Sequence, residues 1–370
     1  MRTEWHLGFW AALAAGVALL LYVLSSVLLP FAAAIALGYL LDPVADKLEK
    51  WGLSRLAATL LILVFFILFF TLALILLAPV LGHQLAAFVA ALPDYVVKLQ
   101  KLATDQFGRI LDSGILNRLG LGDGLSSAQA QKAIADFVGQ GGKILTTFVG
   151  SLWAQGQALI NLVSLIVITP VVAFYMLLDW DKMIASVDSL VPLRYRDDVH
   201  HLSREIDAAL AGFLRGQSLL CLFLGLWYGL GLALIGLNFG FLIGLSAGVL
   251  SFIPYVGSLT ALILSAIVAV VQAWPDWTLL AMAMGVVATG QFLEGNILSP
   301  KLVGNSVGLH PVWLMFALLA FGSLFGFTGL ILAVPLAATF GVILRFAISR
   351  YRDSALYHGG TPPTPPAAEA

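Results

Sequence analysis

The chain of 370 residues has little charge and almost no cysteine. Asp, Glu, Lys and Arg together make up 11% of it, less than half of the roughly 25% usual in soluble domains, and the net charge is −1. A chain with so little charge and no long run of one sign lacks the footprint of a nucleic-acid partner. The single cysteine, Cys221, cannot form an intrachain disulfide, and no Cys or His spacing typical of a metal site occurs. We therefore expect no nucleic acid, no metal and no other cofactor.

Hydrophobic residues dominate instead, at 60% of the chain with a mean hydropathy of +0.98. Several runs reach the roughly 20 residues that cross a bilayer core of about 30 Å as a helix. Helices satisfy their own backbone groups in lipid, so the sequence predicts an all-α protein with several membrane segments and the lipid bilayer as a partner. The first run, residues 7–29, is interpreted as an uncleaved span, because its 23 residues are too long for a secretory signal and Pro30 leads directly into another apolar segment.

Composition changes along the chain indicate its organisation. Residues 1–80 hold the N-terminal spans, with a short charged connection at 42–55. Residues 81–157 are mixed and locally amphipathic, with the turn-rich stretch GLGDGLSS, so they are predicted to form an extracytoplasmic region of short helices.

The second part of the chain begins with a span at residues 158–178, which Pro170 should kink and Asp179 should end. Residues 179–216 are charged, with apolar residues three and four apart, as in an amphipathic helix on the cytoplasmic membrane face. Residues 217–347 are predicted to be the membrane transport region.

Basic residues predict the orientation. If the N-terminus is cytoplasmic, thirteen of the nineteen Lys and Arg residues lie inside, and the other six lie in the long segment 81–157, which translocates largely regardless of charge. Both termini are therefore placed in the cytoplasm. The last segment, residues 348–370, ends in GGTPPTPPAAEA and is predicted to be a disordered cytoplasmic tail.

Two apolar segments, residues 239–273 and 311–345, each carry a Gly- or Pro-containing interruption near the middle, SFIPYVGS and FGSLFGFTG. The halves are shorter than a full span, so the pattern predicts two broken or re-entrant hairpins. By topology they enter from opposite sides, and paired interrupted segments are the best sequence pointer to a transporter's binding site. Simple helix packing is the alternative. Glycines four apart are predicted to allow close helix approach: Gly236, Gly240, Gly244, Gly248, Gly225, Gly229, Gly322 and Gly326.

Polar residues gather at the end of the apolar run between these hairpins. Gln291 and Glu294 are three residues apart and share a helix face, Asn296 extends the polarity, and Pro300 is expected to break the backbone. An ionisable residue in or near a span is by default a functional candidate. Glu294 is interpreted as binding a cation or proton, or as pairing with Lys301 or Arg215.

The alternative for Glu294 is a solvated carboxylate at a helix end. No P-loop motif is present for coupling to ATP, so transport would be secondary, driven by an ion gradient or by the cargo's own gradient. GLGD at 120–123 and GLSAG at 244–248 match protease and hydrolase motifs only by chance, because neither has the required context, and no catalytic residue is predicted. The adjacent residues His200 and His201 are interpreted as a solvated helix face.

Six motifs in one order resemble the successive signatures of the autoinducer-2 exporter family: LLPFAAAIALGYLLDPV, TPVVAFYMLLDWD, GFLRGQ, SFIPYVGS, LEGNILSPKLVGNSVGLHP and GLILAVPLAA. The resemblance spans about residues 20–347 and is weakest in 81–157. It implies a bacterial inner-membrane protein with about eight membrane segments and homo-oligomers, such as pentamers. Family members are linked to export of autoinducer-2, whereas others resemble sodium or lithium/proton antiporters.

The candidate residues fall into two groups. Those assigned to a substrate or ion pathway are Glu294, Gln291, Asn296, Tyr255, Pro254, Gly257 and Ser323. Those assigned as gating or signature positions are Asp179, Arg215, Gln217, Pro300, Lys301, Gly304, His310, Pro311, Gly326, Gly329 and Pro335. The function predicted is a secondary transporter exporting a small polar metabolite or signalling molecule. A sodium (lithium)/proton antiporter is the first alternative, and a membrane scaffold or regulator that does not transport is the second.

Overall fold

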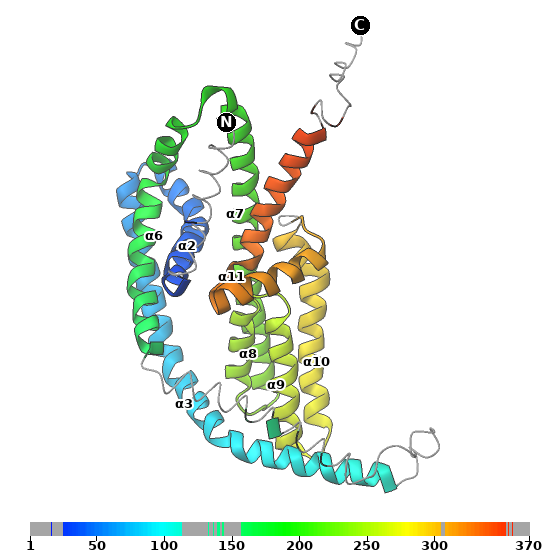
Figure 1. Cartoon of the computed structure of the whole chain (residues 1–370). Helices are drawn as coiled ribbons and strands as arrows, with labels where there is room; N and C mark the ends of the chain where they lie inside the picture. Colours follow the sequence, from blue (N-terminus) through cyan, green and yellow to red (C-terminus); the bar gives the residue numbers. More distant parts are fainter. Residues whose placement is uncertain are drawn as a thin grey trace. The chain divides into compact units, whose positions relative to one another are not determined.

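The structure is a computed structural model that describes residues 25–112, 157–304 and 308–352, with isolated positions elsewhere. Within these ranges the chain is helical and contains no β-strand (Figure 1). The helices are α2 (Ser25–Lys50), α3 (Arg55–Asp112), α6 (Gln157–Ser189), α7 (Arg196–Leu234), α8 (Gly240–Leu250), α9 (Val256–Ala273), α10 (Thr278–Leu293) and α11 (Pro311–Arg352). A 3-10 turn, η1 (Leu193–Tyr195), precedes α7, and a π-helix, η2 (Glu294–Val303), continues α10.

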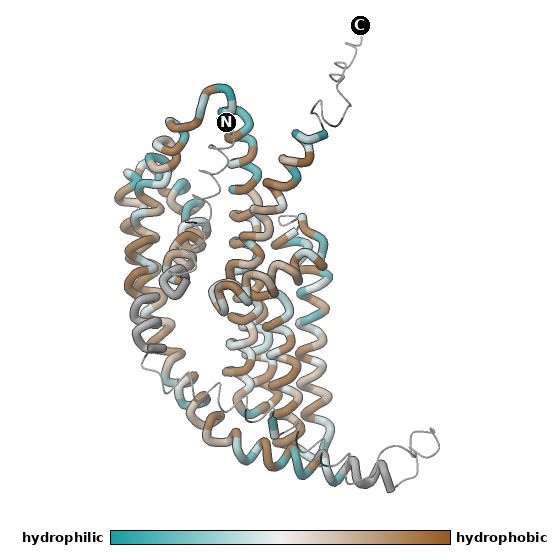
Figure 2. Tube along the Cα trace, in the orientation of Figure 1, coloured by the Kyte–Doolittle hydropathy of each residue, from teal (hydrophilic) through white to brown (hydrophobic). Residues whose placement is uncertain are grey.

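Six helical stretches of the described residues are long and apolar enough to cross a membrane, which confirms the all-α membrane class. They are Leu29–Lys50, Arg55–Leu102, Leu193–Leu234, Val256–Ala273, Thr278–Val303 and Pro311–Arg352. Large apolar side chains are exposed along them, as at Phe65, which is 69% exposed, and lipid is the medium that such surfaces require. Figure 2 shows hydrophobic residues along most of these helices and hydrophilic residues gathered where α6 turns into α7. The expected count of about eight segments includes residues 7–24, almost all outside the described part.

The chain divides into two compact units. The first comprises residues 1–66, 164–219 and 297–370, so it contains α2, most of α6 and α11. Its helices α2 and α6 pack through Ala34, Leu37 and Ala173, which are buried, with Phe66 of α3 against them.

The second unit comprises residues 67–163 and 220–296. Helices α8, α9 and α10 lie side by side in it (Figure 1). The last part of α7 packs against α8 through glycine: a Cβ added at Gly225 would lie 3.6 Å from the Cα of Gly248, and one added at Gly244 would overlap the backbone of Gly229. The predicted close approach of glycine-bearing helices is therefore confirmed for α7 and α8.

The first predicted interruption is confirmed as a tight turn between two packed helices. Helix α8 ends at Leu250 and α9 begins at Val256, so the break falls within SFIPYVGS. Tyr255 adopts a left-handed backbone with φ 68°, which is unusual for a residue with a side chain. Gly257 is required at the start of α9, because an added Cβ would overlap Ser251 and the Ala247 carbonyl oxygen.

The second interruption is also found where FGSLFGFTG predicted it. By its hydrogen bonds, α11 extends from Pro311 to Arg352. Within it, the backbone of Gly326 is not helical, with φ 59° and ψ −137°. Figure 1 shows the bend in α11. The two halves contact each other beside it, since a Cβ added at Gly322 would lie 2.8 Å from Leu330 and one at Gly329 would overlap the Phe321 carbonyl.

Several helices continue through polar residues and prolines past the places where the sequence predicted them to end. Helix α2 passes Pro30 and reaches Lys50, so most of the charged connection at 42–55 is helical. Helix α3 does not end near residue 80 but continues to Asp112, so this part of 81–157 is one extended helix rather than short ones. Proline lacks only one backbone donor, and neighbouring helices and local adjustments can accommodate it within a membrane helix.

The same correction applies further along the chain. Asp179 does not end α6, which runs on to Ser189, and Lys182 pairs with the Asp179 carboxylate at 2.8 Å on the exposed helix surface. No helix boundary separates 179–216 from 217–347, because α7 is continuous from Arg196 to Leu234. Helix α11 also passes residue 347 to end at Arg352, and almost all of the tail beyond it lies outside the described residues.

Candidate functional site

Glu294 lies where a buried stripe of α10 would continue. The buried residues of this helix are Leu279, Ala283, Val287 and Gly290, spaced by three or four residues as on one helix face. Glu294 follows four residues later, so a carboxylate occupies the next place on the packing face. Its Oε2 atom is buried and has no hydrogen-bond partner among the described residues. A buried polar atom without a partner is costly and calls for a functional reason.

Tyr228 of α7 lies beside this carboxylate. The side chain is fully buried, and its ring rests on Gly290, where an added Cβ would lie 2.8 Å from the hydroxyl oxygen. Gly290 and Glu294 are four residues apart, so the ring rests about one helical turn from the residue that carries the carboxylate. The Gln291 side chain faces the Tyr228 hydroxyl without a well-formed hydrogen bond, so this hydroxyl also lacks a partner among the described residues.

Charge is nearly absent from the surroundings of this pair. Between residues 220 and 296 the sequence contains two charged residues, Asp276 and Glu294. Asp276 lies in the exposed turn before α10, where its carboxylate accepts hydrogen bonds from the Thr278 backbone N–H at 2.9 Å and hydroxyl at 2.6 Å. These hydrogen bonds lower the pKa of Asp276. Asp276 is thus a residue of the turn that precedes α10, and Glu294 is the one charged side chain on the helices of this stretch.

The polar residues after Glu294 form a π-helix rather than a break at Pro300. Residues Glu294–Val303 are π-helical, and the Gly304 N–H donates to the Ser299 carbonyl at 2.8 Å, five residues back. The helix ends at Gly304, whose φ of 54° is left-handed, so the prediction of a break at Pro300 is wrong. π-Helical turns are rare and frequent at functional sites. The Asn296 amide donates to the Phe292 carbonyl at 3.0 Å within the helix.

Other predicted pathway residues lie near the hairpin turns. Helices α9 and α10 are adjacent and antiparallel, so the turn containing Pro254 and Tyr255 lies at the same end of this pair as Glu294. Tyr255 is exposed, and its carbonyl accepts from the Ser258 hydroxyl at 3.1 Å. Ser323 belongs to the first unit, where its hydroxyl donates to the Ala320 carbonyl at 2.9 Å beside the bend of α11.

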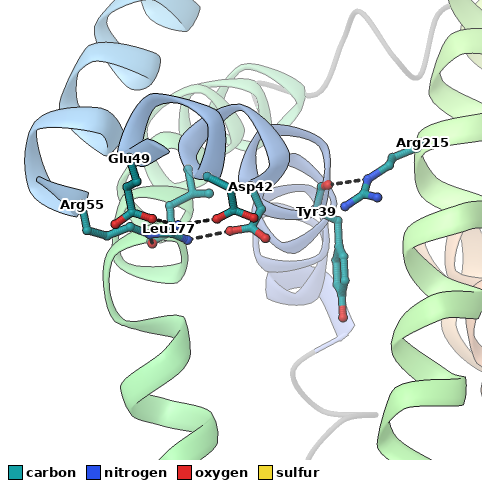
Figure 3. Close-up of polar contacts among 7 residues, drawn as sticks. Tyr39, Asp42, Glu49, Arg55, Leu177 and Arg215 are labelled. Atoms are coloured by element: carbon teal, nitrogen blue, oxygen red, sulfur yellow. Dashed lines mark hydrogen bonds and ion pairs between the residues drawn. The ribbon is translucent and has the colours of Figure 1, made fainter. Parts of the chain in front are cut away.

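Arg215 does not pair with Glu294, the partner that the sequence analysis considered for it. Its Nε donates to the Tyr39 backbone carbonyl at 3.1 Å, which joins α7 to α2 within the first unit (Figure 3). The two residues line a pocket of about 200 Å³ together with Asp42, Trp180 and Asp207. Arg215 is therefore described as a residue of this pocket, and no ion pair between it and Glu294 is observed among the described residues.

Arg55 anchors the neighbouring end of α2. Its guanidinium contacts the carboxylates of Asp42 at 2.6 Å, Asp46 at 2.9 Å and Glu49 at 3.0 Å, and its Nε donates to the Leu177 carbonyl of α6 at 2.9 Å (Figure 3). The partly buried guanidinium offsets one of the three carboxylate charges around it, so the cluster stays negative. The charged segment 42–55 thus holds α2, α3 and α6 together at one end.

The remaining signature positions lie at helix contacts, at helix starts or on exposed surface. Gln217 is buried, and Gly216 beside it lets the backbone of Leu302 approach α7, since a Cβ added there would overlap the Leu302 carbonyl. Lys301 and His310 are exposed. Pro311 is the first residue of α11, a place where a missing N–H costs nothing, and the Pro335 carbonyl accepts from the Thr339 hydroxyl at 2.9 Å.

The extended part of α3 contacts the loop that leads into α8. Gln84 Oε1 accepts from the Leu242 N–H at 3.0 Å, in the first turn of α8. The rings of Phe88 and Tyr95 lie 5.3 Å and 6.3 Å from that of Phe239, a non-glycine residue with a left-handed backbone. The described part of 81–157 therefore supports the start of the first hairpin.

Sequence reasoning identified Glu294 and Gln291 but missed Tyr228. A tyrosine in an apolar run carries no signal by itself. The available pattern was a glycine, Gly290, four residues before Glu294, and a tyrosine on another span. To place the tyrosine against this glycine, one must know which helices pack together.

Comparison with known proteins assigns the chain to a transporter group. A family model described as AI-2E family transporter matches residues 7–349. YrrI of Bacillus subtilis, named as a candidate transport protein, is 30% identical over 327 residues, 87% of each chain. PerM of Escherichia coli K12, named as a candidate permease, is 27% identical over 331 residues, 88% of each chain.

Proposed function

The chain belongs to the AI-2E family of transporters and is a multi-pass membrane protein, and from this premise we propose that it is an ion-coupled secondary transporter. The proposed cargo is a small polar metabolite or signalling molecule resembling autoinducer-2, exported across the bacterial inner membrane. We include in this proposal cytoplasmic termini and assembly into homo-oligomers, such as pentamers.

One observation supports ion coupling above the others. Glu294 is the one charged residue on the helices between residues 220 and 296, and its buried Oε2 has no partner among the described residues. A carboxylate in that environment is expensive to keep unless its charge is used. A carboxylate that gains and loses a cation or proton could link an ion gradient to cargo movement.

Flux in inverted membrane vesicles tests this proposal. Vesicles from cells that express the chain would be energised to an acidic interior and followed with a pH-sensitive dye while autoinducer-2 is added. An exporter that exchanges cargo for protons takes cargo into the vesicle and releases protons, so we expect the pH gradient to fall. We expect Glu294→Gln to reduce this response to that of vesicles without the protein, because the amide keeps the size of the side chain but cannot ionise.

Asp276→Asn is the matched control, because Asp276 is the other charged residue of the stretch and lies in an exposed turn. It should keep the wild-type response at equal protein density. A response to NaCl or LiCl without one to autoinducer-2 would overturn the cargo assignment in favour of the sodium (lithium)/proton antiporter. A normal response in well-folded Glu294→Gln would refute the role of Glu294, and a chain with no flux of any of these would support the scaffold or regulator alternative.

A further inference from the structure

We infer that Tyr228 and Glu294 together form a proton-binding site, in which the carboxyl takes up and releases one proton against the tyrosine hydroxyl. The inference names the ion and the second residue of the proposed coupling site, and it rests on the proposed function for its role in transport. Binding of the proton itself can be measured without any cargo.

Among the described residues, two buried polar atoms without hydrogen-bond partners occur on neighbouring helices of this unit, with the Tyr228 ring resting on Gly290, one helical turn before Glu294. The Tyr228 hydroxyl and Glu294 Oε2 are both buried and both lack a hydrogen-bond partner among the described residues. They come from different helices, α7 and the α10–η2 junction, and Tyr228 is fully buried. The two atoms are chemically complementary, since a hydroxyl can both donate and accept.

The complementarity holds in both protonation states of the carboxyl. When Glu294 is ionised, the Tyr228 O–H can donate to it. When Glu294 is protonated, its own O–H can donate to the Tyr228 oxygen, and the tyrosine keeps its proton throughout. One proton is gained or lost at Glu294 in each cycle, and this proton alone decides which of the two groups donates.

Few other titratable groups lie near Glu294: Tyr255, in the α8–α9 turn at the same end, is exposed, and Asp276 lies at the opposite end of α10. Helices α8 and α9 contain no ionisable side chain, and the 220–234 part of α7 contributes only Tyr228 and Cys221. Gln291 faces the pair from the same helix as Glu294 but does not ionise, and Lys301 lies two turns further along η2. The site therefore carries a charge of −1 or 0, according to the proton.

A proton suits this site better than a metal ion. No group of three or more His, Cys, Asp or Glu side chains that could hold a metal occurs among the described residues. One carboxylate and one hydroxyl offer too few oxygens for a hard cation, which takes six or more. A single carboxylate is sufficient for a proton.

The position of the Tyr228 ring requires glycine at position 290. Any Cβ at this position would lie 2.8 Å from the Tyr228 hydroxyl and closer still to the ring, so the ring would have to move away from α10. Gly285 on the same helix has nothing within 4 Å of an added Cβ. The two glycines thus separate the effect of displacing Tyr228 from the effect of adding a methyl group to α10.

Infrared difference spectroscopy of the full-length protein in lipid provides the test. Titration with pH should give a carboxyl C=O band that is present in wild type and absent in Glu294→Gln. We expect Tyr228→Phe, which removes only the hydroxyl, to change the frequency of this band and shift its midpoint by about one pH unit, the size of losing one hydrogen bond to a charged group. Gly290→Ala should produce a similar change.

Two variants serve as controls: Tyr175→Phe, an exposed tyrosine of α6, and Gly285→Ala should leave the band unchanged. The inference is overturned if no band is lost in Glu294→Gln, if Tyr228→Phe leaves frequency and midpoint unaltered, or if NaCl at constant pH removes the band as acid-to-base titration does. The spectroscopic test uses no cargo, so it is independent of the transport assay. If the pair titrates but the protein does not transport, only the proposed function is contradicted. If the protein transports but the pair does not titrate, only this inference is contradicted.

Discussion

Asp188 connects the end of α6 to the start of α7. Its carboxylate accepts hydrogen bonds from Arg196 and His200, which lie across the turn formed by η1. His200 is exposed, as the sequence predicted, but its partner lies 12 residues away across a turn that the sequence did not predict. These hydrogen bonds, from Arg196 first and His200 second, hold the pKa of Asp188 below its ordinary value.

This lowered pKa predicts how the stability of the α6–α7 turn depends on pH. A carboxyl with a folded-state pKa below the unfolded value of about 3.9 stabilises the fold fully above that value, and the contribution is lost as pH falls through the folded pKa. Asp188→Asn should therefore lower the melting temperature at about pH 5, and the difference from wild type should vanish on further acidification below about pH 4. A difference that persists unchanged at acidic pH would contradict an ionic origin.

At the same scale, the candidate site was only half predictable. Glu294 and Gln291 stand out in the sequence because polar residues are rare in an apolar run, and the structure places them at one end of α10. Tyr228 does not stand out, since an aromatic residue is compatible with a span and its role depends on resting against Gly290. Similarly, Arg215 was considered a partner of Glu294 because of its charge, whereas its observed hydrogen bond is with the Tyr39 carbonyl.

At the scale of elements, breaks that need unusual backbone geometry were predictable and helix ends were not. SFIPYVGS and FGSLFGFTG contain the glycines that a tight turn and the left-handed Gly326 require, so their positions agree with the structure. Pro300, which was predicted to break the backbone, lies within η2, and the prolines at 30, 79, 93 and 170 also lie within helices. Packing and lipid, which local sequence does not encode, decide whether a helix continues past such a residue.

The contact between α7 and α8 gives a prediction at this scale. A Cβ at Gly248 would overlap the backbone of Gly225, so Gly248→Ala should push the helices apart and destabilise the protein by about 1–3 kcal/mol, as overpacking does. Gly285→Ala should instead be neutral or stabilise by up to about 1 kcal/mol, because alanine is the better helix former and the site is open. Thermal melting of the purified variants in detergent measures both. Equal shifts for the two variants would show that the α7–α8 contact is not tight.

At the scale of the whole molecule, the asymmetry of basic residues predicts how the chain is inserted. All six Lys and Arg residues expected outside fall within 81–157, whose length makes them weak determinants, whereas the short connections carry the others. The described part of α3 extends through Lys101, and Lys47 lies in the last turn of α2 on the other side of the predicted span. These two lysines are thus expected on opposite faces of the membrane.

Cysteine labelling can measure this orientation, because Cys221 is the one cysteine of the chain and Cys221→Ala removes it. In that background, Lys101→Cys should react with an impermeant maleimide in intact spheroplasts. Lys47→Cys should react only after the membrane is permeabilised, since three basic residues between 42 and 55 hold that end of α2 in the cytoplasm. The reverse pattern would invert the topology and, with it, the side from which protons reach Glu294. Labelling of both positions in sealed spheroplasts would show that residues 55–80 do not form a span.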